Sequence, residues 1–337
     1  MKRLHAYLGS ALIAALPTAG VAAQDHTYVY VSPNPIGVNK ALQAVQKAVE
    51  QTAKDHSATT KTFEGNDPAT RRDSVQAAID LGAEVTVVFG FEFNDIITDL
   101  GSANPNTKFV MVDSCIERPT SNVYCGTFRQ REVSYLVGAE AALTSRTGSI
   151  AVIGAVDIPY LHRYTDAYEL GAKAARADIK VFPPLWVGGN NPFGDPVRAN
   201  AQAQVQISQR VDRIFALTAG GNGGIFQAAA ANKGVLAIGY DINQCPEQPG
   251  ALIDSALQKY DVVIKEMVQR ALDNSPKNVA DFGLKEGGLA LVGMAPGVAS
   301  SQCTIVDFPK EVVAKLNDLK AKIASGEIQV PDGAAAK

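Results

Sequence analysis

Short runs of β-branched and aromatic residues alternate with segments of helical periodicity along most of this chain. Several runs are apolar at every position, which is typical of strands covered on both faces. Between the runs, apolar residues recur at helical spacing, as in Ala41, Val45 and Val49. This order predicts an α/β fold with parallel sheets and helices on both faces of each sheet. The runs span residues 28–31, 85–89, 109–112, 150–153, 213–217 and 235–238.

The length of 337 residues exceeds what a single hydrophobic core usually serves, so we expect two lobes. No stretch has the composition of one flexible linker, which indicates that the chain crosses between the lobes more than once. We place the crossings near residues 125–129, 254–257 and 282–288. The predicted first lobe comprises residues 24–128 plus 255–281, and the second comprises 129–254 plus 282–337.

Residues 1–23 have the pattern of a secretory signal peptide. A basic start at Lys2 and Arg3 precedes an apolar stretch from Ala6 to Leu16, and small residues end at Ala23. A membrane anchor is the alternative, but Pro17 and the small residues leave too short an apolar length. No cysteine follows the stretch, so no lipid-anchored end is expected. The mature chain is predicted to be exported to the periplasm.

Charge and cysteine content narrow the partners and the compartment. The net charge of −3 argues against a nucleic-acid or anionic-membrane partner. We expect a monomer. Four cysteines in an exported chain predict disulfides. Cys115 and Cys125 suit a bridge between one strand's loop and the next strand, which leaves Cys245 with Cys303, although four cysteines permit three connectivities.

Catalytic and metal motifs are missing from the sequence. It contains no nucleophile elbow, no H-E-x-x-H motif, no phosphate-binding loop and no Cys/His cluster. We therefore expect neither an enzyme nor a bound metal or cofactor. The enzyme alternative is a secreted nucleoside or sugar hydrolase that uses Asp113 and Asp241 as a carboxylate pair.

Polar residues follow several predicted strands, where open α/β sheets bind ligands. Asp241 and Lys259 come just past two consecutive strand-like runs. A glycine-rich loop at residues 218–224, with Gly220 and Gly221, precedes a helical pattern. Such a loop brings backbone N–H groups close to a ligand, or it is simply a tight turn. It is not a dinucleotide fingerprint, because Phe226 stands where a small residue is needed.

The order of several segments resembles that of the basic membrane protein family of substrate-binding proteins for ABC transporters. The best understood members of this family are purine nucleoside receptors. The resemblance runs from about Tyr28 to Leu272, and it implies a type I periplasmic-binding-protein fold, with two Rossmann-like lobes joined by a three-crossover hinge. The segments that carry it are 37–39 (Gly-Val-Asn), 108–113 (KFVMVD), 135–139 (YLVGA), 193–196 (FGDP), 219–224, 239–244 (GYDINQ) and 255–259 (SALQK).

The resemblance also implies roles for individual residues. Asp241 and Lys259 match residues that contact ribose hydroxyls, and a carboxylate can accept from two hydroxyls while an ammonium donates. A salt bridge between these two residues is the structural alternative. Asp113 matches a ligand contact, although a turn-forming role is equally compatible with its place after a strand. Asn39 matches an asparagine that reads a base edge.

One position departs from the family pattern. Val38 stands where family members commonly have an aromatic residue that stacks on the base. The candidates to replace it are Phe91, Phe93, Trp186 and Phe193, with Phe193 preferred and core packing an alternative for Trp186. The amides of Asn190, Asn191 and Gln244 suit a neutral ligand, and no arginine cluster favours phosphate.

The predicted function is that of an extracytoplasmic solute-binding protein of an ABC importer. It would bind a nucleoside-like or purine-like small molecule between its lobes and deliver it to permease subunits in the membrane. Two further alternatives keep the same fold. One binds a different heteroaromatic or sugar-like solute, and the other couples binding to a membrane sensor.

Overall fold

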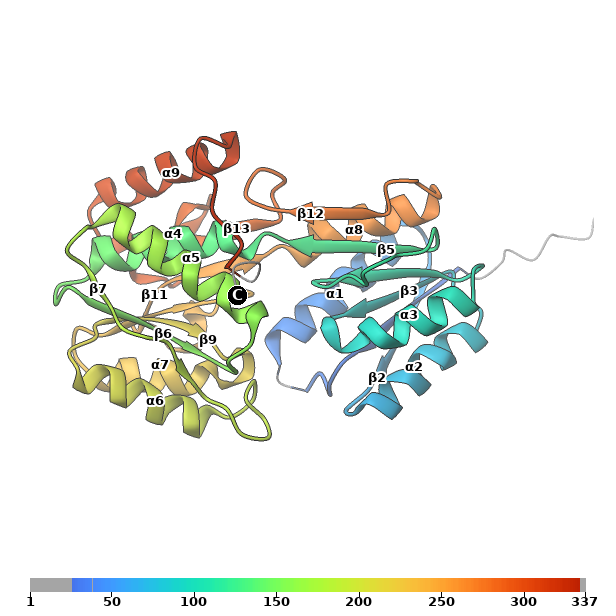
Figure 1. Cartoon of the computed structure of the whole chain (residues 1–337), viewed down its shortest axis with the longest axis horizontal. Helices are drawn as coiled ribbons and strands as arrows, with labels where there is room; N and C mark the ends of the chain where they lie inside the picture. Colours follow the sequence, from blue (N-terminus) through green and yellow to red (C-terminus); the bar gives the residue numbers. More distant parts are fainter. Residues whose placement is uncertain (1–25, 38, 334–337) are drawn as a thin grey trace, which may run out of the picture.

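The computed structural model describes residues 26–37 and 39–333. The predicted signal peptide, Val38 and residues 334–337 lie outside the described residues. The chain forms two sheets, seen on the two sides of Figure 1. All pairings in the first sheet are parallel. Its strands, in order, are β12 (Val279–Phe282), β5 (Val123–Phe128), β4 (Lys108–Val112), β3 (Val85–Phe89), β1 (Thr27–Ser32) and β2 (Thr59–Glu64).

The second sheet is parallel except for one edge strand, β13, which runs antiparallel to its neighbour β11. A short strand, β8 (Leu185–Trp186), also pairs with β6. The strands in order are β13 (Leu289–Leu291), β11 (Leu252–Gln258), β10 (Leu236–Gly239), β9 (Arg213–Leu217), β6 (Ser149–Gly154) and β7 (Lys180–Val181). Together the two sheets confirm the α/β prediction and the type I periplasmic-binding-protein fold.

Helices cover both faces of the first sheet. Alternate residues of a strand point to opposite sides, so each buried strand contributes side chains to two cores. Tyr28 and Tyr30 of β1 share a core with α1 (Lys40–Asp55) and α8 (Tyr260–Leu272). Val29 and Val31 share a separate core with α2 (Pro68–Asp80) and α3 (Asn94–Ala103). This two-sided burial explains why the strand is apolar throughout.

The second sheet is covered in the same way. Figure 1 shows α4 (Gln130–Thr144), α5 (Pro159–Ala175) and α9 (Lys310–Ser325) on one face, and α6 (Pro196–Ser208) and α7 (Asn222–Ala231) on the other. All six strands predicted from apolar runs are present, as β1, β3, β4, β6, β9 and β10. The sequence pattern missed β2, whose residues TTKTFE are half-buried or exposed because it is an edge strand.

The chain passes between the sheets three times: from β5 to β6 through α4, from β11 to β12 through α8, and from β12 to β13. Arg129 lies at these passages. Its guanidinium donates to Glu132 at 2.5 Å and to the Asp281 carbonyl at 2.6 Å, and it also contacts Glu286. Residues 255–258 belong to β11, so the second passage begins at Lys259, past the residues 254–257 expected from the sequence. The lobe boundaries themselves stay a prediction.

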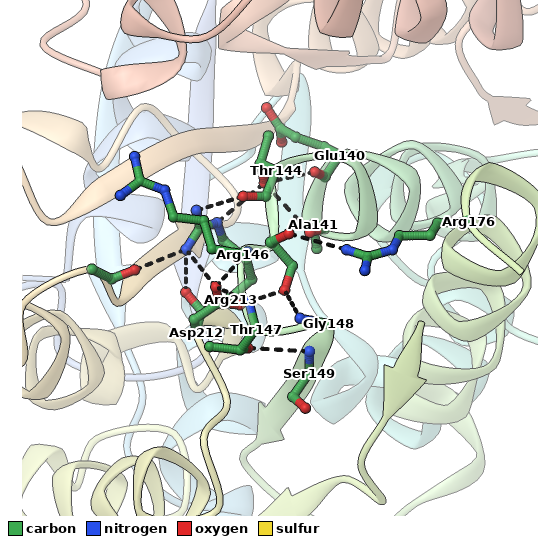
Figure 2. A network of polar contacts seen from close by, with 12 residues as sticks. Glu140, Ala141, Thr144, Arg146, Thr147, Gly148, Ser149, Arg176, Asp212 and Arg213 are labelled. Atoms are coloured by element: carbon green, nitrogen blue, oxygen red, sulfur yellow. Dashed lines mark hydrogen bonds and ion pairs between the residues drawn. The ribbon is translucent and has the colours of Figure 1, made fainter. Parts of the chain in front are cut away.

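A buried polar network ties β9 to the end of α4, at the amino-terminal edge of the second sheet (Figure 2). Arg213 is 1% exposed and donates to the side chain and the carbonyl of Thr144 at 3.1 and 2.6 Å. Asp212 accepts from the backbone N–H groups of Arg146 and Thr147 and from the hydroxyl of Ser145. Because Arg213 and Asp212 are both hydrogen-bonded, neither is left as an unpaired buried charge.

The disulfides join the pairs favoured by the sequence. Cys115 is bonded to Cys125 with a Cα–Cα distance of 5.3 Å, and Cys245 is bonded to Cys303 with a distance of 5.0 Å. The first bridge holds the loop after β4, and the second holds the loop after β10. Both loops carry an aspartate at the interlobe cleft described below.

We expect Gly138→Ala to lower the free energy of unfolding by about 3 kcal/mol, because a methyl group there overfills a close contact. A Cβ at Gly138 of α4 would lie 1.9 Å from the carbonyl oxygen of Tyr168 in α5, and Gly171 faces Tyr135 in the same way. Gly223→Ala is the matched control, since a Cβ there meets nothing within 4 Å in α7. It should change stability by less than about 1 kcal/mol. Urea unfolding of both variants tests this, and equal stabilities would contradict the packing argument.

Candidate ligand-binding site

A cavity lies between the lobes, at the carboxyl ends of the parallel strands. Its empty volume is about 900 Å³, which includes the solvent at its mouth. In each sheet, the strand order reverses between two neighbouring strands, β1 and β3 in the first and β6 and β9 in the second. Loops leave such a pair in opposite directions and open a crevice. Most of the lining residues lie at the ends of these four strands or in the segments that follow them, and the others are Asp113, Phe193, Tyr240, Asp241 and Gln258.

Asp113 follows β4 with a left-handed backbone, at φ 69°. The Tyr160 hydroxyl donates to its Oδ2 at 2.9 Å, and the Gln130 amide donates to its Oδ1 at 2.9 Å. Burial raises the pKa of Asp113 to about 7, and the charge of Asp241 adds to this rise, whereas the hydrogen bonds from Tyr160 and Gln130 oppose it. The carboxyl is held in place by residues of the other lobe's helices α4 and α5.

Asp241 follows β10 and has the same unusual backbone, at φ 74°. The Tyr260 hydroxyl of α8 donates to its Oδ1 at 3.3 Å. Burial raises the pKa of Asp241 to about 6, while the hydrogen bond from Tyr260 lowers it. Left-handed backbones of non-glycine residues are costly and gather at functional sites. Ala219, in the loop after β9, is a third example on the same cavity, at φ 48°.

Aromatic rings form much of the cavity wall. Tyr160, Tyr164 and Tyr240 are linked by edge contacts, with ring centroids 5.9 and 5.0 Å apart in succession. Burial raises the pKa of all three hydroxyls well above the usual range, so they remain neutral donors and acceptors. Phe89, Phe91 and Phe193 also line the cavity.

The tyrosines were not identified from the sequence. Tyr240 directly precedes Asp241 and Tyr160 follows the predicted strand at residues 150–153, so their positions after strands were the available signal. Tyr164 could be inferred only through helical spacing from Tyr160. Glu92, which follows β3, was also missed, and burial raises its pKa.

The structure brings five of the predicted site residues together on this cavity: Asn39, Phe91, Asp113, Phe193 and Asp241. Asn39 also caps α1, because its Oδ1 accepts from the N–H groups of residues 41 and 42 at 3.1 and 3.2 Å. The cap thus occupies the Oδ1 of Asn39 and does not involve its Nδ2.

The glycine-rich loop contributes at the edge of the site. Gly220 lines an outer cavity that shares Asn39, Phe193 and Asp241 with the inner one. The N–H of Gly221 is already bonded to the carbonyls of Phe193 and Thr218, at 3.2 and 2.8 Å. The loop therefore acts mainly as a tight turn that brings Ala219 and Phe193 to the cavity.

Three predicted residues lie apart from the cavity lining. Phe93 is fully buried in the core that the first sheet shares with α2 and α3. Trp186 packs on β6, where a Cβ at Gly154 would lie 2.2 Å from its ring, and its ring also contacts His162. Lys259 is the residue before α8, and its ammonium lies 4.0 Å from Asp261 with the side chain 40% exposed. Its partner is thus Asp261, and not Asp241 as in the salt-bridge alternative. Val38 lies outside the described residues.

The predicted amides divide between two roles. Asn190 and Asn191 line the outer cavity. Gln244 also lines the outer cavity, but its side chain is already bonded to Asn222, to the N–H of Tyr240 and to Glu247. Among the described residues, no group of three or more His, Cys, Asp or Glu side chains is arranged to hold a metal ion. In residues 26–37 and 39–333, none of the helices has both the length and the apolar character required to cross a bilayer.

We expect Asp113→Asn to stabilise the unliganded protein by about 2 kcal/mol at pH 8, because it removes a carboxylate whose ionisation burial disfavours. The pKa in the folded protein, about 7, is above the ordinary aspartate value of 3.8. The cost of ionisation is therefore absent below pH 4 and fully present above pH 7. Denaturant unfolding at pH 5 and pH 8 measures the gain, with Asp261→Asn as the exposed control. A gain that does not grow with pH would contradict this account.

Comparisons with known proteins agree with this architecture. The profile of the family described as ABC transporter substrate-binding protein PnrA-like matches residues 37–334. Basic membrane protein A2 of Borrelia garinii subsp. bavariensis is 30% identical over 256 residues, which cover 75% of this chain and 72% of that protein. The ABC transporter nucleoside-binding protein BmpA of Lactococcus lactis subsp. cremoris is 26% identical over 287 residues, which cover 80% and 77%.

Solved structures show the same fold. The ABC transporter solute-binding protein of Aeropyrum pernix K1 aligns with a TM-score of 0.78 and 21% identity, over 91% of this chain and 94% of that chain. A solute-binding protein of Conexibacter woesei aligns with a TM-score of 0.73 and 18% identity. With the profile match spanning most of the sequence, the chain belongs to the family of PnrA-like ABC transporter substrate-binding proteins.

Proposed function

We propose that this protein is an exported receptor of an ABC importer that captures a small heteroaromatic solute, of the nucleoside or nucleobase class, between its two lobes. The observation that carries the proposal is the aromatic, carboxylate-bearing cavity at the strand ends of both sheets. The nucleoside-binding name of the Lactococcus lactis relative supports the ligand class. Permease subunits in the membrane are the proposed partners.

The lining chemistry supports such a ligand. Planar rings are bound well by aromatic side chains, and Phe91 and Phe193 come from different lobes. The Asp113 and Asp241 carboxyls accept hydrogen bonds from hydroxyl or N–H groups. The Asn39 amide adds a donor at the edge of the first lobe.

Capture requires that the two lobes move relative to each other. Ligand groups held by both lobes favour the closed state, because binding shifts the equilibrium by its difference in affinity for the two states. The three passages between the lobes, with Arg129 bonded to Glu132, Asp281 and Glu286, form the proposed hinge. A permease that recognises the closed shape would then couple capture to delivery.

The first test identifies the ligand and its site. Protein purified from its native host should carry a heteroaromatic compound, detectable by mass spectrometry after denaturation. Returned to ligand-free protein at 100 times its dissociation constant, the compound should stabilise the fold by about 2.7 kcal/mol in thermal unfolding. It should also be recovered intact after incubation, since a receptor does not convert its ligand, whereas a hydrolase would release products.

Asp241→Ala should weaken binding of that compound about 10- to 100-fold, since a charge-assisted hydrogen bond contributes about 1.5 to 3 kcal/mol. Asp261→Ala is the control, because Asp261 is exposed on α8 and does not line the cavity. Isothermal titration calorimetry measures both variants. Equal affinities of the Asp241→Ala variant and the control would place the ligand outside this cavity and refute the proposal.

A further inference from the structure

The inner cavity has a strongly one-sided charge. Three acidic side chains line it, Glu92, Asp113 and Asp241, and no Lys or Arg side chain is among its described lining residues. Lys40 and Arg71 line only the outer cavity, and Arg71 donates to Pro33 and Asn34. Arg163 contacts the ring of Tyr160, but its guanidinium is paired with Asp332 at 3.1 Å.

Hydrogen-bond acceptors are also in excess. Gln258 is 5% exposed and lines the cavity, and its Nε2 donates to the Tyr240 hydroxyl at 2.8 Å. Its Oε1 is buried and has no hydrogen-bond partner among the described residues. A buried acceptor without a partner is costly, so this oxygen needs a donor from a ligand or a water molecule. Tyr160 and Tyr260 already direct their hydroxyl protons to Asp113 and Asp241.

Aromatic faces surround these acceptors. Tyrosine and phenylalanine rings attract cations through their negative faces, and aromatic cages are a recurrent way to bind quaternary or protonated amines. The rings that line this cavity are those of Phe89, Phe91, Tyr160, Tyr164, Phe193 and Tyr240. Acidic groups, an unpartnered carbonyl and an aromatic wall all favour the same ligand property, a positive charge with N–H or N-methyl groups.

We propose that the inner cavity selects a positively charged heteroaromatic solute, such as an N-alkylated or protonated nitrogen heterocycle, over a neutral one of the same shape. This inference rests on the proposed receptor function and departs from the neutral ligand expected from the sequence. It assigns Asp113 and Asp241 as the counter-charges of the ligand, and Gln258 as the acceptor for a ligand donor.

The charges of Asp113 and Asp241 should make the affinity for a cationic ligand depend on pH. Asp113 is faced by Tyr160 of α5, Gln130 of α4, Asp241 and Glu92, and Asp241 is faced by Tyr260 of α8. Burial raises the pKa of Glu92, and the positive charge of Arg71 opposes that rise. The raised pKa values, about 7 for Asp113 and about 6 for Asp241, mean that both carboxyls gain protons as the pH falls below 7. A cation prefers the ionised carboxylates, so its affinity should fall as the pH falls from 7.5 to 5.5 and level off above pH 7.5.

Matched pairs of probes test the inference. The pairs are N1-methylnicotinamide with nicotinamide, and 1-methyladenosine with N6-methyladenosine, in which the first member of each carries a positive charge and the second is neutral. Titration calorimetry of the full chain at pH 7.5 should show that the cationic member of at least one pair binds at least 10-fold more tightly. This preference should shrink at least threefold at pH 5.5.

Variants separate a specific role of the carboxyls from a general effect of charge. Asp113→Asn and Asp241→Asn keep the size of the side chains and should each reduce the preference for the cation at least fivefold. Asp261→Asn, an exposed change outside the cavity, should leave the preference as it is. A loss of preference in this control as strong as in the cavity variants would overturn the assignment.

The remaining outcomes are distinguishable from a failure of the proposed function. Neutral probes that bind as tightly as the cationic ones, or a co-purifying compound without positive charge at pH 7.5, would overturn the charge preference and leave the receptor function standing. If no probe binds and no compound co-purifies, the receptor function fails together with the inference.

Discussion

Buried carboxyls at the ends of parallel strands are the constraint on which this site depends. Asp113 and Asp241 sit in left-handed backbone conformations and partly out of water, and burial raises their pKa values to about 7 and 6. Such positions are costly to the folded protein, and the surrounding structure must hold them. A ligand that donates to these groups, or brings the opposite charge, relieves the cost, so ligand-free stability is lower than it would be with apolar residues there.

The rest of the fold holds these two residues in place. The two disulfides end near them: Cys115 lies two residues after Asp113, and Cys245 four residues after Asp241. Side chains of α4, α5 and α8, namely Gln130, Tyr160 and Tyr260, donate hydrogen bonds to the two carboxyls. At the far edge of the second sheet, Arg213 is instead bonded to Thr144 and to the carbonyl of Asp212. Buried side-chain oxygens without a hydrogen-bond partner among the described residues include Oε1 of Gln258, which lines the cavity, and Oε1 of Gln130, whose amide nitrogen donates to Asp113.

Hydrogen bonds at the cavity join residues of the two lobes, which bears on the proposed mechanism of capture. Tyr160 belongs to the second lobe and its hydroxyl is bonded to Asp113 at the end of a first-lobe strand. Contacts of this kind cross the cleft, so opening of the lobes must break or rearrange them. In the proposed receptor, ligand capture, the protonation of Asp113 and the separation of the lobes would thereby be connected through one group of side chains.

The fold class and the buried strands follow from the sequence, because strands covered on both faces must be apolar throughout. An even number of cysteines predicted disulfides and favoured the observed pairs, but three connectivities were possible until the fold brought the partners together. The sequence also placed Asp113 and Asp241 at strand ends, since position after a strand is a local property. Strand β2 was missed because an edge strand is half exposed and has no apolar run. Only the tertiary structure decided which strand-end residues meet, placing Tyr160, Tyr164 and Gln258 on the cavity while Trp186 packs on Gly154 and Lys259 lies beside Asp261. The reason is that side chains from distant segments converge only through the strand order and the packing of two lobes, which no local pattern specifies.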